Sequence, residues 1–500
     1  MKRILLFLIL PFLGYPLLAQ KNVFTYPFEF EKSFLQKSDY DAFFLDDQTG
    51  EAFAFVLRDN KKVSYAMADK KFKIASQFSK QLGETLFGHS DYSYLGGTVD
   101  KNIYHYIYKE KEKKVYMEEN VDFEAKSISN KQLFEIPKEE QLLISFSDHN
   151  RYFTITANKK TSDLQFYEVS YTGEASTKTV HFNIPPIKKD KIGLSDYLAN
   201  LKLVKEGEEP GLNIATQKAK LFCHADRLEF LVNVDANPTH IFTLDLNTFT
   251  ATEKFFDHSD MEDKEGKGKS YISSFLKDGK LFTLILNKKD IRLAVYDQHS
   301  GALINKTVLT DDDALASLAQ PPVSESRMGN KRNATDVDNF KKVVAAFKTG
   351  TEGITVSTNK SGQYVLQVGT YDPIQTSSGG GWQGGYQHNP AFVSSAATPS
   401  VMPYTYNPML LYYPGVSSYM STSARYYRTL YFKMLLDPTT LKPVRGRVPE
   451  SIGDQIKDFV DDTDKKAKAT KQFNMDGKEY YGYYDKDQTA YVIQEIMIRK

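Results

Sequence analysis

Cysteine is nearly absent from this sequence, since Cys223 is the only one in 500 residues. No disulfide can therefore form within the chain, and stability has to come from a hydrophobic core. A chain of this length buries most of the surface that it exposes when unfolded. Hydrophobic residues make up 41% of the sequence and aromatic residues 13%, which is enough to supply such a core.

An excess of either charge is also missing, because the formal net charge is only +1. A groove for nucleic acid or a patch for anionic membranes usually shows as a surplus of lysine and arginine. The balance therefore favours neither a nucleic-acid partner nor a membrane-surface partner.

Long apolar runs are missing beyond the first 19 residues, so we expect no transmembrane segment in the mature chain. The N-terminus carries Lys2 and Arg3, then an apolar run over residues 4–19, and then turns polar. This order is typical of a secretory signal peptide. The run is broken by Pro11 and Pro16 and is shorter than the about 20 residues of a spanning helix. We predict a signal peptide over residues 1–19 and a periplasmic or secreted mature protein.

Short catalytic and metal-binding signatures are absent as well. The nine histidines form no His-x-x-x-His pair, and Cys223 stands directly beside His224 rather than at a metal-ligand spacing. On a strand, Cys223 is interpreted as a small buried hydrophobe and His224 as its outward neighbour. The Gly-x-Ser-x-Gly pattern of serine nucleophiles does not occur. The sequence therefore predicts no catalytic residue, no metal ligand and no cofactor.

Two local segments imitate ligand sites without meeting their requirements. Residues 266–270 resemble the end of a phosphate-binding loop, but Asp263 stands where that loop needs glycine. Residues 257–263 are rich in oxygen ligands but lack the order of a calcium loop. We interpret the second segment as a solvated charged loop.

A repeated pattern of three short alternating strands, joined by polar turns, is what the sequence does contain. In the first copy, Phe53, Phe55 and Leu57 alternate with smaller residues. The copies occupy residues 43–69, 94–117, 142–169, 221–246, 272–296 and 473–493, and a split copy occupies 354–371 and 430–436.

The spacing of these copies favours a propeller. Turns that start at Asp59, Lys109, Asn158, Asp235 and Asn287 are 50, 49, 77 and 52 residues apart. Repeats of about 40 to 50 residues are typical of propeller blades, whose small sheets pack into a closed ring. We predict an all-β fold, a β-propeller of about six to eight blades over residues 20–500. Tandem β-sandwich domains are the alternative because the spacing is irregular, and an outer-membrane barrel is disfavoured because the strands are short and rich in lysine.

Three helical insertions and a closing strand complete the predicted fold. An apolar stripe after Thr335 predicts a helix, with Asp338 completing a capping-box-like start and Gly350 a C-terminal stop. Residues 195–204 and 449–460 give weaker signals. We expect these helices to cap the ring from outside. The strand at residues 491–500 is expected to pair with residues 22–30 and close the ring.

One insertion, residues 376–424, differs in composition from the rest of the chain. It is almost free of charge and rich in glycine, serine, proline and tyrosine. Rigid aromatic rings on an adaptable backbone suit contact surfaces, although an excursion from a hairpin without such a role fits the same composition. The candidate partner-binding residues are Trp382, Tyr386, Tyr404, Tyr406, Tyr412, Tyr413 and Tyr419.

The sequence thus predicts an exported, non-catalytic binding or scaffold protein. Its partner would be a protein, a peptide or a glycan, engaged through loops on one propeller face; no oligomeric state is assigned. The alternative is a propeller-type glycan or peptide hydrolase or lyase, with its site in the central channel.

Overall fold

The structure is a computed structural model. It describes residues 21–29, 41–47, 49–59, 61–87, 89, 91–184, 193–206, 209–233, 238–259, 261, 271–287, 289–311, 314–315, 318–328, 331–373, 426–448, 450–463, 468–475 and 477–498. The predicted signal peptide and the insertion at residues 376–424 lie outside these ranges. Within them, every helix falls short of the length and apolar content that crossing a bilayer requires.

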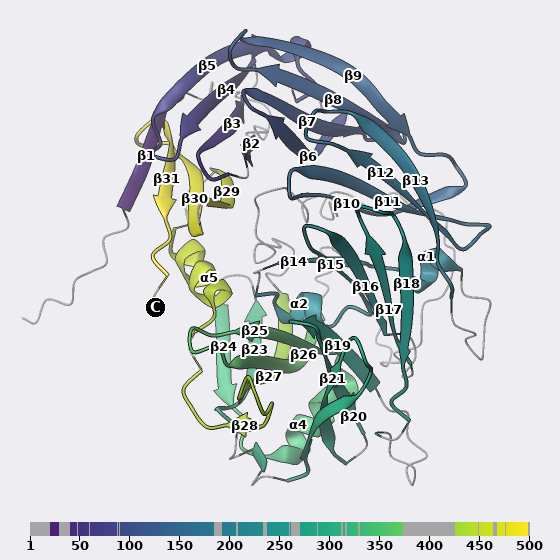
Figure 1. Ribbon diagram of the computed structural model, residues 1–500. Coiled ribbons are helices and arrows are strands. Elements are labelled where there is room, and N and C mark those ends of the chain that lie inside the picture. Colours follow the sequence, from purple (N-terminus) through teal and green to yellow (C-terminus); the bar gives the residue numbers. More distant parts are fainter. Residues whose placement is uncertain are drawn as a thin grey trace, which may run out of the picture.

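Seven sheets built from the described residues follow one another around a ring, and we number them as blades 1 to 7 (Figure 1). Blade 1 contains β2 (Asp41–Asp46), β3 (Ala52–Arg58), β4 (Lys62–Asp69) and β5 (Ile74–Gln81), followed by the short helix η1 (Leu82–Glu84). Blade 2 contains β6 (Tyr92–Asp100), β7 (Ile103–Glu110), β8 (Val115–Asp122) and β9 (Ser127–Glu135). Blade 3 contains β10 (Glu140–Asp148), β11 (Arg151–Asn158), β12 (Asp163–Val169) and β13 (Ala175–His181).

The next two blades continue this pattern, with additions in blade 4. Blade 4 contains β14 (Lys202–Lys205), β15 (Ala219–Cys223), β16 (Arg227–Asn233), β17 (Thr239–Asp245) and β18 (Ala251–Phe256), with α1 (Leu194–Tyr197) and α2 (Leu212–Ala215) before β15. Blade 5 contains β19 (Tyr271–Lys277), β20 (Lys280–Leu286), β21 (Ile291–Asp297) and β22 (Leu303–Leu309).

The last two blades contain the other helices and the closure of the ring. Blade 6 contains β23 (Gln320–Met328), β24 (Lys331–Asp336), β25 (Glu352–Thr358), β26 (Tyr364–Pro373), β27 (Tyr426–Leu436) and β28 (Pro443–Val444), with α4 (Phe340–Thr349) before β25. Blade 7 joins β1 (Lys21–Pro27) to β29 (Lys468–Met475), β30 (Lys478–Asp485) and β31 (Ala490–Glu495), and α5 (Ile452–Thr463) precedes it.

The two ends of the described chain meet in blade 7. β1 pairs antiparallel with β31, from Lys21 opposite Glu495 to Pro27 opposite Ala490. The predicted pairing of the two terminal strands is therefore confirmed. It joins the first and last parts of the chain in one sheet, so the ring is closed by backbone hydrogen bonds.

The hydrophobic core lies between neighbouring blades. Phe44 and Phe53 of blade 1 pack with Phe473 and Tyr491 of blade 7, and comparable clusters join blades 1 and 2, 2 and 3, and 3 and 4. A further cluster runs through blades 4, 5 and 6. Between blades 6 and 7, α5 supplies Ile456 and Val460, which pack against blade 7 (Figure 1). Two sandwich domains would each enclose a separate core, so this continuity confirms the propeller and excludes the alternative.

Each of the seven predicted strand triplets corresponds to three consecutive strands of one blade. The sequence pattern missed the outer strand of most blades, including β5, whose residues alternate between exposed and half-buried. An outer edge strand buries little apolar surface, so its sequence is largely polar and carries a weak signal.

The predicted helices are only partly confirmed. The helix before Gly350 exists as α4, but it does not start after Thr335, which belongs to β24. Its N-cap is Asn339, whose side chain accepts a hydrogen bond from the amide of Lys342 at 3.1 Å. α5 confirms the helix near residues 449–460. The helix predicted over residues 195–204 is wrong: α1 is only four residues long, Asn200 follows with φ +58°, and β14 then pairs parallel with β15. A positive φ is incompatible with a right-handed helix.

Candidate functional site

Three places in the ring bear on function: the base of the 376–424 insertion, the inner side of the ring, and a cluster of ligating side chains at the opposite face. All seven predicted partner-binding residues, from Trp382 to Tyr419, lie outside the described residues. The strands that carry the insertion are described, and they define where it leaves the fold.

The insertion leaves from the longest strands of the ring, β26 and β27. They pair directly up to Pro373 opposite Tyr427, and β23 pairs with β27 on its other side up to Met328 opposite Tyr426. The ring of Tyr371 stacks on that of Tyr427 at a centroid distance of 5.5 Å. The Tyr427 hydroxyl donates a hydrogen bond to Oε1 of the buried Glu325 at 2.5 Å. These contacts make the base of the insertion a rigid, three-stranded platform.

The direction of the strands places several connections at the same face as this platform. In an antiparallel meander, the connections from the second to the third strand of each blade, and from one blade to the next, leave at one face of a propeller. The strands β13, β16, β18 and β26 therefore all end at one face. The tight turns between first and second strands are on the other.

Part of blade 4 lies on the inner side of the ring. Figure 1 shows β14 and α2 on this side, and α2 packs against β25 and β26 of blade 6. Gly353 and Gly369 stand opposite each other in the pairing of β25 with β26. A Cβ on Gly353 would lie 2.6 Å from the carbonyl carbon of Ala215, and a Cβ on Gly369 would lie 2.9 Å from Cδ1 of Leu212. The two glycines thus allow α2 to approach the sheet closely.

The side chains of α2 are apolar and buried. Leu212, Ile214 and Ala215 are each less than 10% exposed. Close by, burial lowers the pKa of Lys220 to about 7, and its ammonium donates a hydrogen bond to the carbonyl of Gln217 at 2.8 Å. Burial therefore explains the lowered pKa of Lys220, and its amine binds the backbone of a residue three positions earlier.

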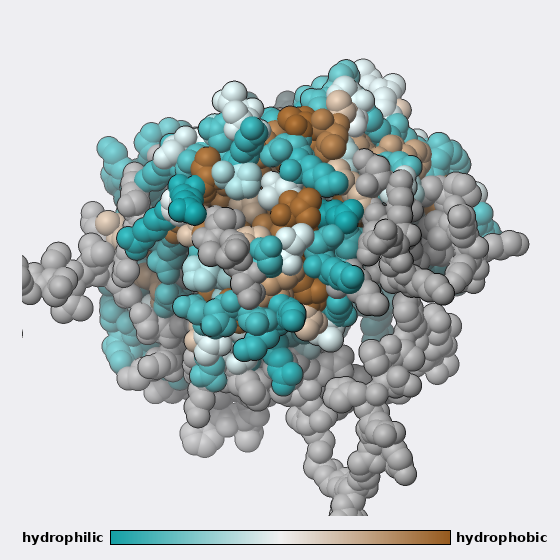
Figure 2. All heavy atoms as spheres, turned by 90° about the horizontal axis from the view of Figure 1, so that it is seen from below, coloured by the Kyte–Doolittle hydropathy of each residue, from teal (hydrophilic) through white to brown (hydrophobic). Residues whose placement is uncertain are grey.

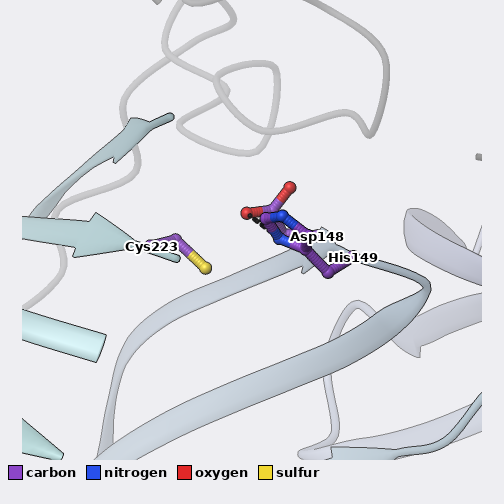
Figure 3. Close-up of side chains that lie close together, drawn as sticks. All are labelled: Asp148, His149 and Cys223. Atoms are coloured by element: carbon purple, nitrogen blue, oxygen red, sulfur yellow. Dashed lines mark ion pairs between the residues drawn. The ribbon is translucent and has the colours of Figure 1, made fainter. Parts of the chain in front are cut away.

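A cluster of ligating side chains lies where blades 3 and 4 meet, at the face of the tight turns (Figure 3). Asp148 ends β10, His149 is in the following turn, and Cys223 ends β15. One ligating atom from each lies within 4.8 Å of the others. Nδ1 of His149 is 3.1 Å from Oδ2 of Asp148, while Nζ of Lys205 is 3.8 Å from Oδ1.

Cys223 is buried, as the sequence predicted, and His224 beside it is half-buried and paired with Glu229 through Nε2 at 2.9 Å. Burial, followed by the charge of Asp148 and a hydrogen bond to it, raises the pKa of the Cys223 thiol well above its ordinary value. The free thiol is therefore protonated at neutral pH and is a poor nucleophile. Sequence reasoning missed its neighbours because they belong to another blade.

Other buried ionisable groups lie within a blade or between two blades. Glu118 is fully buried between the imidazole of His105 at 2.5 Å and the ammonium of Lys131 at 3.0 Å, inside blade 2. Glu119 accepts hydrogen bonds from the Tyr65 hydroxyl at 2.7 Å and from the backbone amide of Leu86. These acids are enclosed by protein, so they serve the fold.

Exposed hydrophobic side chains are scattered. On β22, the outer strand of blade 5, Leu303, Ile304 and Val308 are each more than 40% exposed. Figure 2, which looks from below at the view of Figure 1, shows hydrophobic patches separated by hydrophilic side chains. Among the described residues, this face presents no continuous apolar surface.

Comparisons with known proteins assign this chain to no family. No known protein family matches the sequence, and no curated protein shows significant similarity. Similar solved structures include the WD40 domain of SCAP from fission yeast, at 8% identity and a TM-score of 0.29, covering 96% of this chain and 88% of that one. The β-propeller domain of the Trilobed protease from Pyrococcus furiosus matches at 11% identity and a TM-score of 0.24, covering 67% and 91%.

A third similar structure is the dihydro-heme d1 dehydrogenase NirN, at 9% identity and a TM-score of 0.26. The match covers 66% of this chain and 61% of NirN, so about two fifths of that protein has no counterpart here. Enzymes and a WD40 domain thus both occur among these structures. The assignment of the present chain as a β-propeller rests on its own blades and closure.

Proposed function

We propose that this protein is an exported, non-catalytic binding or scaffold protein that engages a macromolecular partner through loops on one propeller face. Residues 376–424 supply the main contact surface in this proposal. The observation that carries it is the platform of β23, β26 and β27, which projects the insertion from the longest strands of the ring.

Rigid support matters because binding loops lose less entropy on association when their ends are fixed. Tyr371 and Tyr427 stack at the base of the insertion, and Glu325 anchors Tyr427. The aromatic and uncharged composition of the insertion then suits a protein, peptide or glycan surface.

The position of α2 argues against the alternative, a hydrolase or lyase with a central site. Such a site needs an open cavity with converging ionisable groups. Here α2 brings buried apolar side chains to that place, and Lys220 is bonded to its own segment.

The experiment compares the chain over residues 20–500 with a variant in which residues 376–424 are replaced by Gly-Ser. Because Pro373 and Tyr427 are paired neighbours, a short hairpin connection spans this gap without disturbing β26 and β27. A second variant keeps the length of the insertion but changes its tryptophan and six named tyrosines to serine.

Partners are captured by crosslinking in the cell envelope, identified, purified and titrated against all three proteins. We expect both variants to bind at least about tenfold more weakly, a loss of about 1.4 kcal/mol. Equal affinity for the parent and the Gly-Ser variant would show that the insertion has no role. Turnover of a glycan or peptide by the parent would favour the enzyme instead.

A further inference from the structure

Asp148, His149 and Cys223 bring a carboxylate, an imidazole and a thiol from two neighbouring blades to one point (Figure 3). We propose that these three side chains bind a divalent transition-metal ion of the zinc class, which links blade 3 to blade 4. This site is on the face opposite the insertion, so it is independent of the proposed partner surface.

The geometry is close to that of a three-ligand metal site. Zinc lies about 2.0 to 2.3 Å from its ligands, so neighbouring ligand atoms in a tetrahedron are about 3.3 to 3.8 Å apart. The three atoms lie within 4.8 Å of one another, and His149 and Asp148 are already 3.1 Å apart. Binding therefore requires an adjustment of about 1 Å. The side chain of His149 is 39% exposed, which leaves room for this adjustment and an approach for solvent to the fourth position.

Two of the ligands are held in a preorganised turn. His149 and Asn150 have φ values of +48° and +53°, as in the tight hairpin turn that requires positive φ at both central residues. The Asn150 side chain accepts from the amide of Val99 and donates to its carbonyl, each at 2.8 Å, which fixes the turn against blade 2. Nζ of Lys205 donates to the carbonyl of Ser147 at 2.9 Å and holds the strand end from the other side. Such support lowers the entropic cost of bringing ligands together.

The mixture of ligands selects the kind of metal. Magnesium and calcium prefer oxygen ligands only, whereas thiolate and imidazole favour zinc and related ions. Oδ2 of Asp148 is buried and lies 3.1 Å from Nδ1 of His149. The ammonium of Lys205 lies nearer to Oδ1, so it weakens the attraction for a cation without covering Oδ2.

Metal binding has to displace the thiol proton of Cys223, which passes to solvent as the sulfur–metal bond forms. Affinity is thus expected to rise with pH. A bound metal also stabilises the folded state by mass action, because the three ligands from two blades come together only in the folded chain.

The test uses the chain over residues 20–500, without an affinity tag and after treatment with a chelator. It is titrated with Co²⁺ while absorption is recorded. Cys223 is the only cysteine, so a thiolate-to-cobalt charge-transfer band can arise only from this site. We expect one equivalent of Co²⁺ to produce the band, Zn²⁺ to remove it by displacement, and Zn²⁺ to raise the unfolding temperature.

Two variants change proposed ligands, and a third is the control. Cys223→Ser should abolish the band, and His149→Asn, which suits positive φ, should weaken Co²⁺ binding by at least about tenfold. His181→Asn is the control, since His181 is 62% exposed and pairs with Asp163. This variant should bind Co²⁺ as the parent does. Thermal unfolding without metal checks that each variant is folded.

Absence of the band in the folded parent would overturn the proposal, as would a Zn²⁺-dependent rise in unfolding temperature that persists in Cys223→Ser. The variant lacking residues 376–424 should bind Co²⁺ like the parent. The two proposals can therefore fail separately.

Discussion

The junction between blades 1 and 2 and the junction between blades 4 and 5 both contain buried polar groups, but they differ in charge. In the first, Glu119 is fully buried and is approached by Tyr65, Tyr106 and Tyr108. Burial raises the pKa of Glu119 to about 7, against hydrogen bonds that lower it. This junction therefore contains a group whose charge changes near neutral pH.

In the second junction, hydroxyl, amide and imidazole groups form a network around Thr239. Its hydroxyl contacts Nδ2 of Asn233 at 2.8 Å, Nε2 of His258 at 2.9 Å and Oγ of Ser274 at 3.1 Å. Nδ1 of His258 contacts the Tyr296 hydroxyl at 3.1 Å. Each of these contacts joins a hydroxyl, an amide or an imidazole. The same task, joining two blades, is thus performed once by an acid and once by a network of small polar groups.

The largest effect is expected from Glu119→Ala. It removes the acceptor for the Tyr65 hydroxyl and the Leu86 amide and leaves a cavity, so we expect a loss of about 3 kcal/mol in the free energy of unfolding. Urea denaturation measures this. Glu119→Gln keeps the shape and should cost clearly less; equal losses for both variants would mean that these hydrogen bonds contribute little.

The pH dependence of stability should separate the two junctions. The folded state holds the proton of Glu119 up to a pKa of about 7, while the unfolded carboxyl releases it near 4.5. Protonated Glu119 therefore adds to the free energy of unfolding. The addition is complete below pH 4.5, and about 3 kcal/mol is lost as the pH rises through 7. Urea denaturation from pH 4.5 to 8 should show that slope in the parent and a smaller one in Glu119→Gln. An identical slope in both would exclude Glu119 as its source.

The contact of α2 with blade 6 offers a third junction, where buried apolar side chains pack together. Gly353→Ala places a Cβ 2.6 Å from backbone atoms of Ala215 and Thr216, so we expect a loss of about 2 kcal/mol. Gly83→Ala is the control, because its Cβ would meet nothing within 4 Å. Thermal unfolding should show a lower unfolding temperature for Gly353→Ala and an unchanged one for Gly83→Ala. Unchanged stability of Gly353→Ala would mean that α2 moves away without cost.

The smallest effect is expected from Thr239→Val, which keeps the shape but removes the central hydroxyl. Asn233 still reaches Ser274 at 3.2 Å, so we expect a loss of only about 1 kcal/mol. Urea denaturation measures this loss, and an unchanged free energy of unfolding would mean that the hydroxyl contributes nothing to the junction.

Much of the fold could be predicted because its signals are local. Large and small residues alternate in stretches such as Phe53 to Leu57, and this pattern indicates a strand, which the structure buries on both faces. Outer strands such as β5 and the inner strand β14 were missed, since the first buries little and the second is only four residues long. Asn200, with its positive φ, ended a helix that the pattern had extended.

The candidate sites were much less predictable. Glu118 and Glu119 are adjacent acids on β8, and such a pair in a sequence suggests solvent exposure, yet both are fully buried. Cys223 was correctly interpreted as buried, but nothing near it in sequence announced Asp148 and His149. The aromatic insertion at residues 376–424 was recognisable from composition alone, and its role stays a prediction.

By itself, the sequence determined the strand-rich fold, the number of strand triplets and the pairing of the terminal strands, because period-two alternation and turn residues act over a few neighbours. Only the tertiary structure decided which side chains meet between blades. Neighbouring blades bring together residues that are far apart in the chain, such as His149 and Cys223, or Gly353 and Ala215. Those contacts depend on how each sheet packs on the next, and no local pattern encodes that packing.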